Sequence, residues 1–162
     1  MRQAEKFRYL VLAAQREGNR MLAAALRPLG LTPSQAEVLR VLGDHAPLTL
    51  TGLGEMLVCE SGTNPSRLVD RMVELGLVDR ATPDAGDRRQ VILQLTAKGR
   101  ELEGAVRGIE EAMYAGLDGD GTDAELATVI AVLERVVAGH PSGDAIAARV
   151  ARERSQDSRS TD

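Results

Sequence analysis

Apolar positions recur at helical spacing along most of the chain. Between about residues 3 and 27, Leu, Val, Met and Ala side chains repeat at steps of three and four, which places them on one face of a helix. The same pattern predicts further helices at about 32–43, 48–58, 60–76, 97–117 and 122–138. Two of these begin with a capping box, formed by Thr32 with Gln35 and by Thr122 with Glu125. The chain is therefore predicted to be mainly α-helical.

The apolar pattern changes to an alternation between residues 77 and 96. The segments LVDRAT (77–82) and RQVILQLT (89–96) are typical of strands, and PDAGDR between them has the proline, glycine and aspartates of a tight turn. We predict a β-hairpin there, directly after three short helices. The helix before it begins after either Ser61 or Asn64, because both can cap a helix and Pro65 suits the first helical position.

Length and composition fit one domain with an aliphatic core. A chain of 162 residues is about the size of a single domain, which we place at residues 1–150. The chain is 43% apolar, yet its aromatic residues are limited to Phe7, Tyr9 and Tyr114. Residues 151–162 are polar and are expected to form a disordered tail.

Charge is unevenly distributed along the chain. The net charge is −4, but residues 101–162 carry −7 while residues 61–100 carry +2. The overall acidity therefore does not exclude a locally basic surface in the middle of the chain. Apolar runs are far shorter than the roughly 20 residues that span a bilayer, and the N-terminus lacks the apolar segment of a signal peptide. We expect a soluble, cytoplasmic protein without a membrane partner.

The order of the short elements favours a helix-turn-helix. Residues 49–58 would brace residues 62–75, whose N-terminal side chains would enter the major groove of duplex DNA. Such a helix needs small and polar side chains in its first turn. The sequence supplies Ser61, Gly62, Thr63, Asn64 and Ser66 there.

Several segments of this region resemble the MarR family of winged helix-turn-helix regulators. These are LTPSQAEVLRVL (31–42), SRLVDRMVELGLV (66–78), DAGDRR (84–89) and LTAKG (95–99). Together they cover about residues 20–100 in the family's order. The resemblance implies a mainly α fold with a small β-hairpin wing, in which a DNA-binding lobe at about 31–96 is joined to a helical dimerisation region formed by residues 3–27, 97–117 and 122–138.

The resemblance also implies which side chains contact DNA. At the tip of the wing, Arg88 and Arg89 would enter the minor groove, where a narrow groove concentrates negative potential, and Asp87 would orient them. The alternative for this tip is a solvated turn without a task. On the recognition helix, the candidates for base and phosphate contacts are Ser61, Thr63, Asn64, Ser66, Arg67 and Arg71. Asp70 is expected to form an intrachain bridge, as Arg71 could also do.

The family pattern implies a homodimer that binds a pseudo-palindromic operator as a ligand-responsive repressor, with a small-molecule effector that no residue identifies. The alternative is a winged-helix adaptor that binds proteins and no DNA. Because the sequence holds no nucleophile–base pair, phosphate-binding loop or dinucleotide motif, we do not expect an enzyme or a bound cofactor.

The remaining candidate chemistry is weak. DGDGTD (118–123) lacks the acidic residues that a calcium loop needs at its first and twelfth positions. His45 and His140 have no second ligand at metal spacing, so no metal site is predicted and both are expected to be exposed loop residues. Cys59 is the only cysteine, which excludes an intrachain disulfide. It is either a buried small apolar residue or a redox-sensitive thiol near a helix N-terminus.

Overall fold

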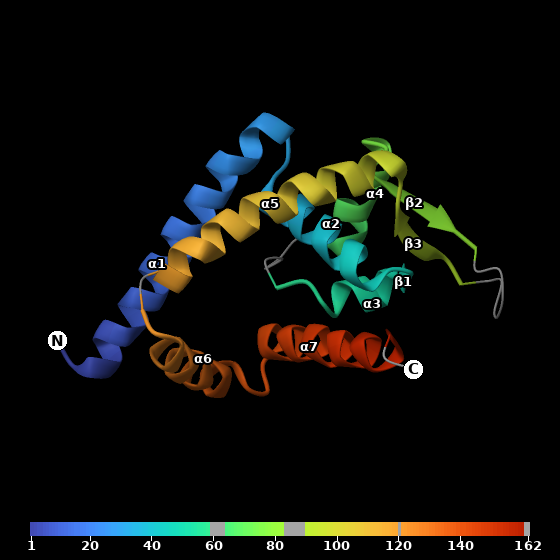
Figure 1. The fold of residues 1–162 in the computed structure, drawn as a ribbon. Helices are drawn as coiled ribbons and strands as arrows, with labels where there is room; N and C mark the ends of the chain where they lie inside the picture. Colours follow the sequence, from blue (N-terminus) through green and yellow to red (C-terminus); the bar gives the residue numbers. More distant parts are fainter. Residues whose placement is uncertain (59–63, 83–89, 120, 161–162) are drawn as a thin grey trace.

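The computed structural model describes residues 1–58, 64–82, 90–119 and 121–160. Helices dominate it, and a small sheet lies on the side of the molecule opposite the N-terminal helix (Figure 1). In chain order the elements are α1 (Gln3–Leu26), η1 (Arg27–Leu29), α2 (Pro33–His45), β1 (Leu48–Thr49), α3 (Leu50–Gly54), α4 (Pro65–Glu74), β2 (Val78–Ala81), β3 (Ile92–Leu95), α5 (Ala97–Gly119), α6 (Asp123–Val137) and α7 (Pro141–Ser160).

Both predicted capping boxes are present. The Thr32 hydroxyl accepts a hydrogen bond from the backbone N–H of Gln35, and the Gln35 side chain accepts one from the backbone N–H of Thr32. Thr122 and Glu125 exchange the same pair of bonds at the start of α6. These local bonds satisfy N–H groups that the first helical turn leaves unpaired, so the two helices begin where the sequence predicts.

The sheet has three antiparallel strands in the order β1-β3-β2. The β2–β3 hairpin was predicted, whereas β1 was not. Leu48 pairs with Leu93 and Thr49 with Ile92, so the start of the predicted 48–58 helix is extended instead. The helix itself, α3, is short, and Thr49 caps it by accepting a bond of 3.0 Å from the backbone N–H of Gly52. The helix therefore begins after Thr49, which the pairing with β3 leaves extended, and it ends at Gly54 rather than at residue 58.

One aliphatic core joins the sheet to the surrounding helices, as the composition predicted. Its fully buried members come from α1, α2, α3, α4, β2, β3 and α5, and they include Leu26, Leu39, Leu42, Leu53, Met72, Val78, Leu93 and Val106. The two long helices α1 and α5 lie against each other and against α2 (Figure 1). They carry the winged lobe at one end of the molecule.

The C-terminal segment departs from the prediction. Residues 151–160 continue the helix α7 rather than forming a disordered tail. The segment is rich in alanine and arginine, which favour helix, and Pro141 stands at its first position. Burial of Ala145, which is 2% exposed, packs the start of this helix against the rest of the chain. The polar composition therefore did not mean the absence of structure, and the side chains of residues 151–155 are exposed on this helix.

Candidate nucleic-acid interface

Helix α4 begins at a cap made by Asn64. Its side-chain oxygen accepts a hydrogen bond of 3.0 Å from the backbone N–H of Ser66, and Pro65 occupies the first helical position. This resolves the two alternative starts in favour of Asn64. Asn64 and Arg67 are exposed and Ser66 is half-buried. Of the other predicted contacts on this segment, Ser61 and Thr63 lie outside the described residues.

One face of α4 is buried and the opposite face is polar. Leu68, Val69 and Met72 pack into the core. The residues that alternate with them at helical spacing are exposed, and these are Asn64, Arg67, Asp70, Arg71 and Glu74. Because the apolar stripe fixes the rotation of the helix, the polar face must point away from the protein. The arrangement suits a helix that a partner approaches from outside.

Two ion pairs hold charged side chains on this face. Asp70 pairs with Arg80 of β2, which joins the helix to the first strand of the hairpin. Arg71 pairs with Glu74 at 3.0 Å, and both side chains are more than half exposed. The intrachain bridges expected at Asp70 and Arg71 are therefore present. Such an exposed pair is worth under about 1 kcal/mol, so it holds the Arg71 side chain only weakly.

The hairpin strands are held in a fixed register. Val78 pairs with Leu95 at the base, and Ala81 pairs with Ile92 at the far end. The predicted wing residues Asp87, Arg88 and Arg89 lie in the stretch between these strands, outside the described residues. Cys59, in the stretch between α3 and α4, also lies outside them. Their roles remain predictions.

The LTAKG motif (95–99) ties the end of α4 to the start of α5. The Thr96 hydroxyl donates a bond of 2.7 Å to the backbone carbonyl of Gly76 and accepts one of 2.9 Å from the N–H of Gly99. The Lys98 ammonium donates a bond of 3.0 Å to the carbonyl of Leu75, at the C-terminal end of α4. Gly76 has a φ of 68°, the left-handed conformation that glycine adopts most easily after a helix. The motif thus positions the recognition helix, a role that the spacing of its residues did not reveal.

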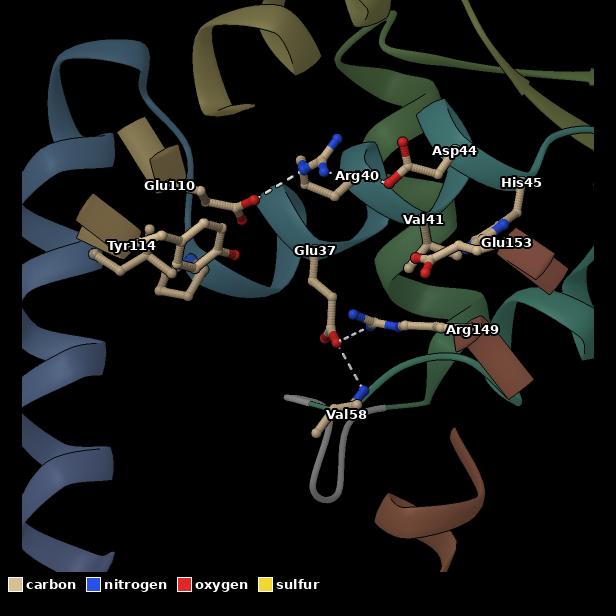
Figure 2. Close-up of a pocket in the computed structure, with 12 residues that line it drawn as sticks. Glu37, Arg40, Val41, Asp44, His45, Val58, Glu110, Tyr114, Arg149 and Glu153 are labelled. Carbon is tan, nitrogen blue, oxygen red and sulfur yellow. Dashed lines mark hydrogen bonds and ion pairs between the residues drawn. The ribbon is translucent and has the colours of Figure 1, made fainter. Parts of the chain in front are cut away.

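A cavity of about 440 Å³ adjoins this lobe. Figure 2 shows side chains from α2, α5 and α7 converging on it. Its lining consists of Leu22, Pro33, Glu37, Arg40, Val41, Asp44, His45, Val58, Glu110, Tyr114, Arg149 and Glu153. The sequence did not identify the residues that line this cavity, because its walls are distant in the chain and α7 was not predicted.

A network of ion pairs joins two walls of the cavity. The Arg40 guanidinium contacts Glu110 at 2.9 Å and also pairs with Glu103, both on α5. Asp44 contacts Arg107 of α5 at 2.6 Å and Arg40 at 3.3 Å. Although burial opposes the charge, the two α5 carboxylates outweigh that effect and raise the pKa of Arg40. The network therefore fixes α5 against α2, a helix of the lobe itself.

His45 is buried, contrary to the expectation of an exposed loop histidine. It is the last residue of α2 and is only 3% exposed. Its Nδ1 has no hydrogen-bond partner in the described part of the chain. Burial lowers the pKa of His45, so the neutral imidazole is favoured. The helix runs through Gly43 to His45, two residues beyond its predicted end, and this extension carries His45 inside.

On another wall of the cavity, Glu37 holds two segments together. Its carboxylate is 8% exposed, accepts a bond of 2.7 Å from the backbone N–H of Val58, and pairs with Arg149 of α7 (Figure 2). The Arg149 Nε donates a further bond of 2.7 Å to the carbonyl of Met56. Residues 56–58 precede the recognition helix, so α7 contacts the segment that leads into it.

Comparisons with known proteins find the same family. The model of the MarR family matches residues 29–90, from the end of η1 to a point just before β3. The crystal structure of apo MarR from Escherichia coli is 27% identical, with a TM-score of 0.61 over 80% of this chain and 95% of that chain. Over this segment, and in its fold, the chain is similar to the MarR family. Its winged helix-turn-helix fold and the resemblance seen in the sequence are confirmed.

Further relatives of this chain include regulators and DNA complexes. The organic hydroperoxide resistance transcriptional regulator of Bacillus subtilis is 33% identical over 95 residues, which is 59% of this chain and 63% of that protein. A mutant E. coli MarR complexed with operator DNA is 28% identical, with a TM-score of 0.68 over 80% of this chain and 91% of that chain. The Staphylococcus aureus MepR–DNA complex shares the fold, with a TM-score of 0.71, 23% identity, and coverage of 81% of this chain and 95% of that chain. The match to the Bacillus regulator thus spans less than two thirds of its length.

The described residues were also searched for a metal site and for a membrane-spanning helix. No group of three or more His, Cys, Asp or Glu side chains is arranged to hold a metal ion in that part of the chain. Among the same residues, every helix is too short or too polar to cross a bilayer.

Proposed function

We propose that this chain is a MarR-family, sequence-specific transcription regulator that binds a pseudo-palindromic DNA operator as a homodimer. The observation that carries the proposal is the polar face of α4, which begins at the Asn64 cap and points away from the core. Two structural relatives were crystallised with DNA, which supports the same reading. Such a regulator acts in the cytoplasm, where bacterial DNA lies, and it needs no catalytic residue.

The proposed contacts fall into two groups. On α4, Ser66 and Arg67 stand in the first turn, where recognition helices of this type meet base edges and phosphates. Arg67 forms no ion pair with the described part of the chain, so its guanidinium is available to guanine or phosphate. The second group is proposed from the sequence alone, because its members lie outside the described residues. These are Ser61, Thr63, Asp87, Arg88 and Arg89.

The dimer is proposed from apolar side chains that a single copy leaves exposed. Helix α6 has no buried residue, and its apolar stripe includes Leu126, Val129, Ile130 and Val136. Helix α1 buries only Leu26 and exposes Phe7, Leu10, Val11 and Leu12. Large apolar surfaces of this kind mark protein–protein interfaces. A two-fold dimer would place two recognition helices about one turn of DNA apart.

Salt-dependent DNA binding tests the proposal. Fluorescence anisotropy with duplex from the region upstream of the chain's own gene should show binding that weakens as salt rises, because phosphate contacts release counterions. Arg67→Ala, and Arg88→Ala together with Arg89→Ala, should weaken binding and lower the salt slope by about one for each phosphate that is no longer neutralised. Arg16→Ala on α1 is the matched control and should change neither. A dimer that ignores every duplex at low ionic strength would instead favour the adaptor without DNA binding.

We propose further that the cavity takes a small-molecule effector. Its lining carries four carboxylates, those of Glu37, Asp44, Glu110 and Glu153, against the guanidinium groups of Arg40 and Arg149. A neutral or cationic ligand is therefore favoured over an anion, and the buried His45 Nδ1 offers it a hydrogen bond. Benzylamine should raise the melting temperature more than benzoate does, and Glu153→Gln, which removes one lining carboxylate, should reduce that difference. Equal effects of both compounds would contradict the proposed ligand class.

A further inference from the structure

Helix α7 folds back along the winged lobe instead of extending from it. Figure 1 shows α7 running beside α2 and α3. A Cβ added at Gly143 would lie 2.2 Å from the backbone carbonyl of Val137, so the connection from α6 leaves room only for glycine. Ala145 is buried and Ala148 packs against the core. The position of α7 is therefore set at its N-terminal end by close packing.

Arg149 is the polar centre of this contact. It is 28% exposed, and its guanidinium bridges the carbonyl of Met56 and the carboxylate of Glu37. Glu37 in turn accepts a hydrogen bond from the backbone N–H of Val58. Arg149 thus holds the Met56 carbonyl directly, and it holds the Val58 N–H indirectly, through the carboxylate of Glu37. These residues stand between α3 and the recognition helix α4.

Loss of Arg149 would leave the Glu37 carboxylate almost fully buried without this cation. Removing one partner of a buried pair is strongly destabilising, because the remaining charge must find other solvation. The least costly relief is outward movement of Glu37 or of the Val58 segment that it holds. The same guanidinium and Glu153 also line the cavity, so a ligand bound there would contact α7 directly.

We propose that α7 is an intramolecular latch for DNA binding. Docked through Arg149, it holds residues 56–58 and with them the start of α4 in the arrangement that binds DNA. Undocking releases this segment and lowers the affinity for DNA. This inference rests on the proposed function, and it adds a regulatory element at the C-terminal end of the lobe.

The test compares Arg149→Gln with Arg152→Gln, a matched change on the exposed side of the same helix. Hydrogen–deuterium exchange on the full chain should show a faster Val58 amide in Arg149→Gln and no change in Arg152→Gln. DNA affinity should fall roughly tenfold for Arg149→Gln and change by under about twofold for Arg152→Gln. Glu37→Gln should reproduce the effect of Arg149→Gln, and the double variant should add little, since both residues act through one contact.

The outcomes are separable. An unchanged Val58 amide in Arg149→Gln overturns the latch, and so does faster exchange with unchanged or tighter DNA binding. If the unsubstituted chain binds no duplex, the proposed function is wrong, and α7 cannot regulate DNA binding. In that case the exchange result still reports whether α7 holds the segment. Arg149→Lys, which keeps the cation but cannot bridge both partners, should give an intermediate affinity and guards against a variant that fails to fold.

Discussion

Gly99 of α5 lies directly against the backbone carbonyl of Leu77, which stands between the recognition helix and the hairpin. A Cβ built on Gly99 would stand 2.0 Å from that oxygen, a separation that no side chain can adopt. The close approach lets the first turn of α5 receive the hairpin and the end of α4 together. It explains why the helix tolerates a glycine near its start despite the cost of glycine in helices.

Gly99→Ala should therefore destabilise the protein by at least about 2 kcal/mol, because the backbone of Leu77 must move to make room. The measurement is urea unfolding at fixed protein concentration. Gly104→Ala, on the same helix but with open space at its Cβ, is the control. It should be neutral or stabilising by about 0.5–1 kcal/mol, since alanine favours helix over glycine. Similar losses for both variants would mean that contact with Leu77 does not limit position 99.

The sequence predicts the elements whose causes are local. The capping residues Thr32 and Thr122 lie within three residues of their partners, so the helix starts at α2 and α6 were foreseeable. The same is true of the cap at Asn64, one of the two starts that the sequence allowed for α4. The hairpin and the aliphatic core follow from short-range alternation and from composition, and the ordered motifs identified the family.

Contacts between distant residues account for what the sequence missed. Glu37 and Arg149 are 112 positions apart, so nothing near either residue shows that α7 docks. The burial of His45 depends on the extension of α2 and on residues of α7 near its ring. Strand β1 exists only because Leu48 and Thr49 pair with β3. The DNA contacts of the wing residues Arg88 and Arg89 stay predictions from the sequence.

The Arg40 network should matter far more than an exposed ion pair. Arg40→Met keeps the bulk of the side chain but leaves Glu103 and Glu110, which are 13% and 17% exposed, without this cation. We expect a loss of about 2–3 kcal/mol in the free energy of unfolding. Arg20→Met breaks the pair with Glu17, where the side chains are 73% and 56% exposed. It should cost under about 0.5 kcal/mol in the same urea titration, and an equal cost at both sites would refute the distinction.

His45 should make stability depend on pH. Because burial lowers its pKa in the folded state below the ordinary value of 6.5, the unfolded chain binds a proton first as the pH falls. The contribution of His45 is therefore constant above that value, is lost as the pH falls below 6.5, and levels off below the folded pKa. We expect the unfolding free energies of the unsubstituted chain and of His45→Gln, measured from pH 8 to 5, to differ by less at pH 5 than at pH 8. A difference between the two chains that stays the same from pH 8 to pH 5 would contradict this prediction.

A charge on the exposed stripe of α6 should separate the proposed dimer. Ile130 is 47% exposed in the single chain, and burial of a glutamate there against a second copy would leave an unpaired carboxylate. Sedimentation of Ile130→Glu should therefore give the mass of one chain where the unsubstituted protein gives two. Thr128→Glu, on the opposite face of the same helix, adds the same charge and should remain dimeric. Because a monomer presents one recognition helix to one half-site, Ile130→Glu should also lose most of its affinity for a full operator while keeping its helical circular dichroism. If Ile130→Glu and Thr128→Glu both sediment as dimers, α6 lies outside the interface.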